Sequence, residues 1–112
     1  MKSVPLSQTY TAGSETFSAV EFRDPTFLDY RRLGPAFDVQ RGIILRDREA
    51  IFAYADRLIQ KPASGALAAL NLEDSMAVEE AIMSFFTQAI RSRNKLANSS
   101  SDSDGSQDTS TV

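Results

Sequence analysis

The sequence predicts an α+β fold, in which an N-terminal β-hairpin precedes three to four helices and a disordered C-terminal tail. Up to Phe22, apolar and polar residues alternate, whereas later segments repeat apolar residues every three or four positions. The last stretch is rich in Ser and Asp and contains almost no apolar residue. The 112 residues therefore fit one domain, residues 1–96, and a disordered tail, residues 97–112.

The predicted hairpin occupies the first 22 residues. Val4 lies in an alternating segment of the first strand, and Pro5 beside it cannot donate to a strand ladder, which indicates an edge strand. Residues 12–15 contain Gly and Ser and suit the turn. Val20 and Phe22 then fall on one face of the second strand. Since two strands alone are marginally stable, we expect helices to cover this face.

A first helix is expected to begin at Thr26 and to end at Gly34. Pro25 disfavours a helical conformation in the residue before it. Thr26 can cap the helix, and Asp29, three residues on, supplies the acidic residue of a capping box. Gly followed by Pro is a typical helix end. Pro25, Thr26 and Asp29 therefore predict a sharp corner between strand and helix.

The middle of the chain is less regular. Residues 35–45 give no clear pattern. A second helix is expected from Asp47 to before Pro62, and a short turn from Ser64 that includes two leucines. The predicted apolar stripe of the second helix consists of Ile51, Tyr54, Ala55, Leu58 and Ile59.

The clearest helix comes last, capped by Asn71 or Asp74 and fraying near Lys95. Its apolar positions span close to half of the circumference, whereas packing on one neighbour needs about 100°. Phe85 lies near the middle of this stripe and is expected in the core. The edge residues expected to form an exposed apolar patch that binds a partner are Met83, Phe86 and Ile90.

Composition argues against several classes of function. The chain has no His and no Cys, so the usual general base and the commonest metal ligands are missing. Acidic pairs such as Glu73 with Asp74 fall at expected helix starts, where carboxylates cap unpaired amides. We therefore expect no enzyme, no cofactor and no metal site.

Charge and hydropathy make nucleic-acid and membrane binding unexpected. The net charge is −3, and Asp102, Asp104 and Asp108 of the tail account for it, which leaves twelve acidic and twelve basic residues. A neutral body does not favour phosphate binding. No apolar run has the length of a signal peptide or a membrane span, so we expect a cytoplasmic protein.

One order of residues resembles a known family. Arg23, Pro25, Thr26 and Asp29, at a corner between a strand and a short helix, resemble the opening motif of phage tail assembly chaperones of contractile-tailed phages. The chain is also similar to them in a leucine-spaced turn, an acidic residue and a Phe pair, across roughly residues 17–90. The residues that carry this second part are Leu67, Leu70, Asp74, Phe85 and Phe86.

The resemblance implies a non-catalytic chaperone that works in the cytoplasm of a bacterial host, from a phage or prophage. Such proteins bind the tape measure protein, keep it soluble and assist assembly of the tail tube, so the tail tube protein is a further possible partner, as is a second copy of the chain. The corner residues, with Asp74 and Phe85, would be structural. Two alternatives stay open: a small DNA-binding or antitoxin-like regulator, and a minor structural tail protein.

Overall fold

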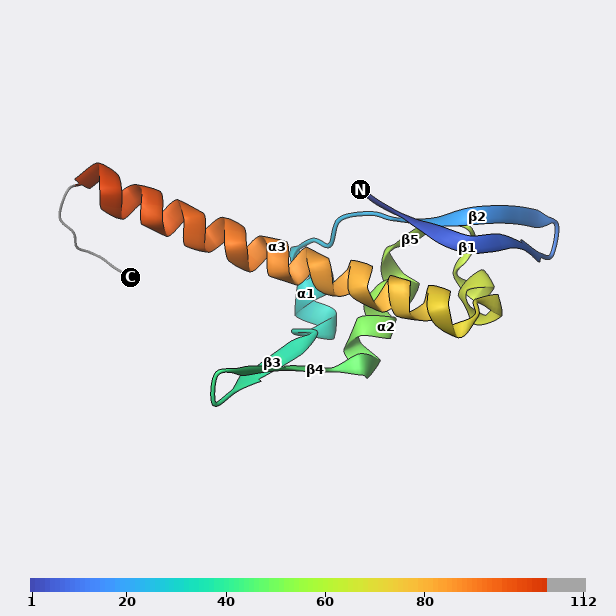
Figure 1. Ribbon diagram of the computed structural model, residues 1–112, viewed down its shortest axis with the longest axis horizontal. Coiled ribbons are helices and arrows are strands. Elements are labelled where there is room, and N and C mark those ends of the chain that lie inside the picture. Colours follow the sequence, from blue (N-terminus) through green and yellow to red (C-terminus); the bar gives the residue numbers. More distant parts are fainter. Residues whose placement is uncertain (105–112) are drawn as a thin grey trace.

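The computed structural model describes the backbone of residues 1–104 and the side chains of residues 1–97. It confirms the α+β class: hairpin strands come first and helices follow (Figure 1). The elements in chain order are β1 (Lys2–Ala12), β2 (Glu15–Phe22), α1 (Phe27–Leu33), β3 (Phe37–Gln40), β4 (Ile43–Arg46), α2 (Arg48–Leu58), β5 (Ile59–Lys61), a 3₁₀ helix (Ser64–Ala69) and α3 (Leu72–Asp104).

The main sheet has the order β1-β2-β5, with both pairs antiparallel. β1 is an edge strand, as Pro5 predicts, and its register pairs Val4 with Val20. The third strand was not predicted: Ile59, expected in the second helix, begins β5 and pairs with Phe22. α2 therefore ends at Leu58, three residues before the expected end next to Pro62.

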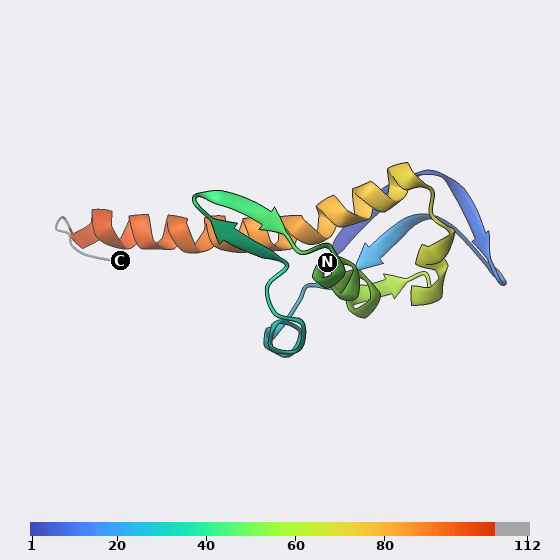
Figure 2. The same cartoon turned by 90° about the horizontal axis from the view of Figure 1, so that it is seen from below.

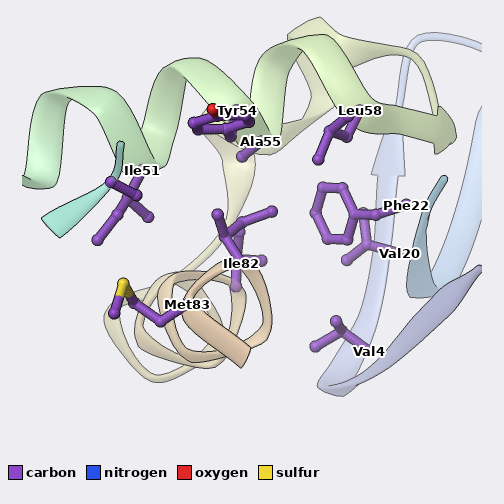
Figure 3. Close-up of a cluster of buried hydrophobic side chains, with 11 residues drawn as sticks. Val4, Val20, Phe22, Ile51, Tyr54, Ala55, Leu58, Ile82 and Met83 are labelled. Carbon is purple, nitrogen blue, oxygen red and sulfur yellow. The ribbon is translucent and has the colours of Figure 1, made fainter. Parts of the chain in front are cut away.

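One hydrophobic core lies between the sheet and the two longer helices (Figure 3). α2 and α3 pack against each other, and α3 also contacts β1. Val20 and Phe22 of β2 point into this core, as the strand alternation predicts, whereas Ser18, which was expected on the same face, is exposed. The buried members that Figure 3 labels are Val4, Val20, Phe22, Ile51, Tyr54, Ala55, Leu58, Ile82 and Met83.

Side-chain caps mark the helix starts that the sequence predicts. The Asp29 carboxylate accepts hydrogen bonds from the Thr26 backbone N–H (2.8 Å) and hydroxyl (3.1 Å) at the start of α1. Asp47 accepts from the N–H of Ala50 (3.2 Å) at the start of α2. For α3 the cap is Asn71, whose Oδ1 accepts from the N–H of Asp74 (2.8 Å).

Two regions differ from the expectation. Residues 35–45, which gave no clear pattern, contain most of a second hairpin, β3–β4, closed at Arg41 and Gly42. α3 continues to Asp104 instead of fraying near Lys95. The predicted disorder of residues 97–112 falls mostly outside the described side chains, and residues 105–112 lie outside the described chain altogether.

Asp74 fastens the start of α3 to β1. Its buried carboxylate accepts hydrogen bonds from the Ser7 N–H (2.9 Å), the Ser7 hydroxyl (2.9 Å) and the Tyr10 hydroxyl (2.5 Å). Burial alone raises the pKa of Asp74, but the bonds from Tyr10 and Ser7 outweigh it and hold the pKa below its ordinary value. Asp74 therefore links the start of α3 to β1 through its side chain.

We predict that Asp74→Asn lowers the melting temperature by several degrees. The NH₂ group of Asn can only donate, so it cannot accept all the hydrogen bonds that Ser7 and Tyr10 donate to the carboxylate. Glu73→Gln, a change of the exposed neighbouring acid, should leave the melting temperature nearly unchanged. Thermal melts of both variants by circular dichroism check this. Equal melting temperatures would mean that the Asp74 contacts contribute nothing to stability.

Candidate partner-binding groove

An apolar groove of about 420 Å³ opens between α1, the start of β3 and the middle of α3. Aromatic and aliphatic side chains form most of its lining, and Arg93 is the one charged residue among those that line it within the described chain. The lining residues are Pro25, Thr26, Tyr30, Phe37, Tyr54, Phe85, Phe86, Ala89, Ile90, Arg93 and Asn94. The groove therefore runs along α3, the helix whose apolar stripe is wider than packing on one neighbour requires.

The α1 wall of the groove is held by a buried carboxylate. Asp29, which is 1% exposed, accepts hydrogen bonds from both terminal nitrogens of Arg23 (2.7 and 3.0 Å) and from Nε of Arg57. Arg23 follows β2 and Arg57 belongs to α2, so one side chain joins three elements. A buried charge needs such partners, because the free-energy cost of removing it from water is otherwise not offset.

These contacts shift the ionisation of the cluster. The hydrogen bonds from Arg23 oppose the effect of burial and, with those from Arg57 and Thr26, hold the pKa of Asp29 far below its usual range. The same Asp29 contact raises the pKa of Arg23. Both groups are therefore charged at every physiological pH.

Phe86 organises the aromatic floor. Its ring lies edge-on to Tyr54 (centroids 5.1 Å apart) and to Phe37 (6.0 Å), and tilted against Tyr30 (6.4 Å). The Tyr54 hydroxyl donates to the carbonyl of Gly34 (2.6 Å), which ties α2 to the end of α1. Such aromatic contacts fix ring orientation more tightly than aliphatic packing does.

The structure brings two of the three expected binding residues together. Phe86 is half-buried and Ile90 is 41% exposed, and both line the groove. Met83 does not: it is 4% exposed and belongs to the core, so its expected place in an exposed patch is wrong. Met83 lies on the side of α3 that faces α2 (Figure 3).

The expected division between a core Phe85 and a surface Phe86 is also not seen. Both rings are half-buried, and both line the groove. Phe85 lies under the Lys2 ammonium group, 5.2 Å from the ring centroid, whereas Phe86 contacts the buried Tyr54. Truncating either ring would therefore cost stability, and Ile90 is the better residue with which to test binding.

No protein-family model, no curated protein and no solved structure matches the chain.

Sequence reasoning missed Tyr30 and Phe37 as lining residues. Tyr30 was assigned only to the first helix, although its position one residue after Asp29 places it on an adjacent face. Phe37 lies in the segment without a clear pattern, so no periodic signal pointed to it. The corner residues Pro25 and Thr26 prove to border the groove as well as to fix the chain direction.

Exposed apolar side chains continue beyond the groove on both sides. On α1, Phe27 and Leu28 are largely exposed, and on the β3–β4 hairpin Val39 and Ile44 are exposed as well. Such continuity is typical of protein interaction surfaces. Among the described residues, no cluster of acidic side chains has the composition of a metal site, and no helix is long and apolar enough to cross a bilayer.

We predict that Asp29 makes stability depend on pH. Because its folded pKa is depressed, the unfolded chain takes up a proton first as the pH falls through about 4, and stability is then lost. The difference in unfolding free energy between the wild type and Asp29→Asn should thus be larger at pH 7 than at pH 3, by urea denaturation. Asp56→Asn, at an exposed site on α2, is the control for the loss of a carboxylate and should leave the unfolding free energy at pH 7 nearly unchanged. A difference that is the same at both pH values would contradict the depressed pKa.

Proposed function

We propose that this protein is a non-catalytic assembly chaperone that holds an apolar helix of a longer protein in the groove between α1, β3 and α3. The observation that carries the proposal is the groove itself, with its aromatic floor and its exposed aliphatic rim at Ile90. Grooves of this kind bind amphipathic helices, which insert side chains at every third or fourth position.

The spread of apolar surface favours a protein partner over a small ligand. A small molecule needs only the enclosed part of a pocket. Here Phe27 and Leu28 extend the surface along α1, outside the groove lining. A helix lying in the groove would cover the rim as well as the floor. Arg93 at one end could pair with a carboxylate of that helix.

The chemistry of the groove suits reversible holding. Burial of apolar surface is a non-directional driving force, so the groove can accept many apolar sequences in turn. No step of such a function requires a reactive side chain. A chaperone must also release its client, which moderate contacts permit.

The resemblance of the strand–helix corner to phage tail assembly chaperones supports the choice of partner. On this basis the client is a tape measure protein, a long helical chain that aggregates unless it is covered, and the place of action is the cytoplasm of the bacterial host. The chaperone would keep the client soluble while tail tube protein assembles around it. The protein should then be absent from purified virions.

Co-expression with the tape measure protein of the same phage tests the proposal. The wild type should move that protein into the soluble fraction and retain it in a pull-down. Ile90→Asp should weaken the binding by about tenfold or more, because it places a charge in the apolar rim. The fold should survive, since Ile90 is 41% exposed.

Met76→Asp is the matched control: Met76 is on the same helix, is 57% exposed and does not line the groove. It should keep the tape measure protein soluble. If Ile90→Asp and Met76→Asp lose binding of the tape measure protein equally, at equal melting temperatures, the binding surface lies elsewhere. A wild-type chain that leaves the tape measure protein insoluble would refute the proposed client.

A further inference from the structure

The β3–β4 hairpin is an isolated two-stranded sheet that projects from the body (Figures 1 and 2). Two-stranded sheets are marginally stable in water unless something packs on them or extends them. The hairpin is attached at its base, where Phe37 meets Phe86 and Arg46 pairs with Glu79 (2.9 Å). Farther out its apolar residues are 45–62% exposed: Val39, Ile43, Ile44 and Leu45.

The two outer edges of the hairpin differ. Arg41 and Gly42 both have positive φ (52° and 78°), which defines a two-residue type I′ turn between Gln40 and Ile43. The pair flanking such a turn is hydrogen-bonded, so the next pair, Val39 and Ile44, directs its backbone groups outward.

On the β3 edge, the outward N–H of Val39 donates to the Asp38 carboxylate (2.9 Å) and is already satisfied. On the β4 edge, the structure gives the outward groups of Ile44 no backbone hydrogen bond to another element of the described chain. Ile43, Ile44 and Leu45 thus form an exposed apolar edge strand. Proteins protect such edges with charges, proline or a cover, because an open one pairs with other chains.

We infer that β4 pairs antiparallel with β4 of a second copy of this chain, around a two-fold axis at Ile44. The pairing joins the two hairpins into a four-stranded sheet with the order β3-β4-β4-β3. Ile43 of each copy then lies opposite Leu45 of the other, so apolar residues meet across the axis on both faces. Symmetric closure of this kind gives a dimer and no further growth at that edge.

Charge complementarity supports this register. Beyond the ends of β4, a two-fold axis at Ile44 brings the turn residue Arg41 of each copy to the same end of the pairing as the helix cap Asp47 of the other, twice per dimer. Arg41 makes no ion pair within the described chain. Arg46 falls opposite Gly42, so its pairs with Glu79 and Glu80 meet no like charge. A two-fold axis at Val39 of β3 would place Asp38 of one copy opposite Gln40 of the other and would pair no opposite charges.

A cysteine scan of the full chain tests the pairing, because the chain has no native cysteine. Opposed residues of a hydrogen-bonded antiparallel pair lie about 5.5 Å apart at Cα, within the range that a disulfide spans. Ile44→Cys should therefore form a covalent dimer under mild oxidation on a non-reducing gel. Val39→Cys is the matched control, on the same face of the hairpin and equally exposed, and should stay uncrosslinked.

Sedimentation should give the wild type at twice its monomer mass of 12.3 kDa. Arg41→Glu should raise the dissociation constant of the dimer by about fivefold, since two exposed ion pairs become repulsive. Adding Asp47→Ser, which keeps a helix cap, removes the repulsion and should bring the dissociation constant part of the way back to the wild-type value. A monomeric wild type, crosslinking of Val39→Cys to an equal or greater extent, or no crosslinking of Ile44→Cys would each overturn the inference.

Discussion

The arrangement of this protein depends on one buried ionic cluster, in which Asp29 binds Arg23 and Arg57. The hairpin β1–β2 and the helices α2 and α3 form the core by apolar packing, but α1 contributes little to it and leaves Phe27 and Leu28 exposed. Besides the packing of Leu33 and the contact of Tyr30 with Phe86, it is the polar contacts of Asp29 that hold α1 in place. Because breaking one partner of a buried pair leaves an uncompensated charge, the cluster has effectively one stable arrangement.

The position of α1 in turn creates the groove. Tyr30 reaches the aromatic floor because Asp29, the residue before it, is fixed toward Arg57. The surface that results is open and mostly apolar, which suits the proposed holding function. The β4 edge lies on the projecting hairpin, separate from the groove lining, so a dimer could present two grooves to one long client. Two linked sites raise the overall affinity while each contact stays weak.

The sequence predicted those parts of the fold that local signals specify. The first hairpin, the α1 cap and α2 depend on alternation, capping residues and helical spacing, all of which act over a few residues. The second hairpin was missed because Arg41-Gly42 replaces the usual Asn-Gly and because Ile43, Ile44 and Leu45 do not alternate. Met83 was misplaced because periodicity measures the width of an apolar stripe without showing which part faces solvent. Long-range partners, such as Arg57 for Asp29, leave no local signal.

Hydrogen exchange on Asp29→Asn tests the central claim, that this carboxylate positions α1 as a wall of the groove. The backbone amides of α1 should lose more protection than those of Ile82 and its neighbours in the α3 core, whose loss at neutral pH should match the fall in global unfolding free energy. Binding of the proposed client, a tape measure protein, should weaken in parallel. Unchanged protection in α1 would contradict the account, because packing alone would then hold the helix. So would a uniform loss across α1 and α3, since the cluster would then support the whole fold instead of the groove.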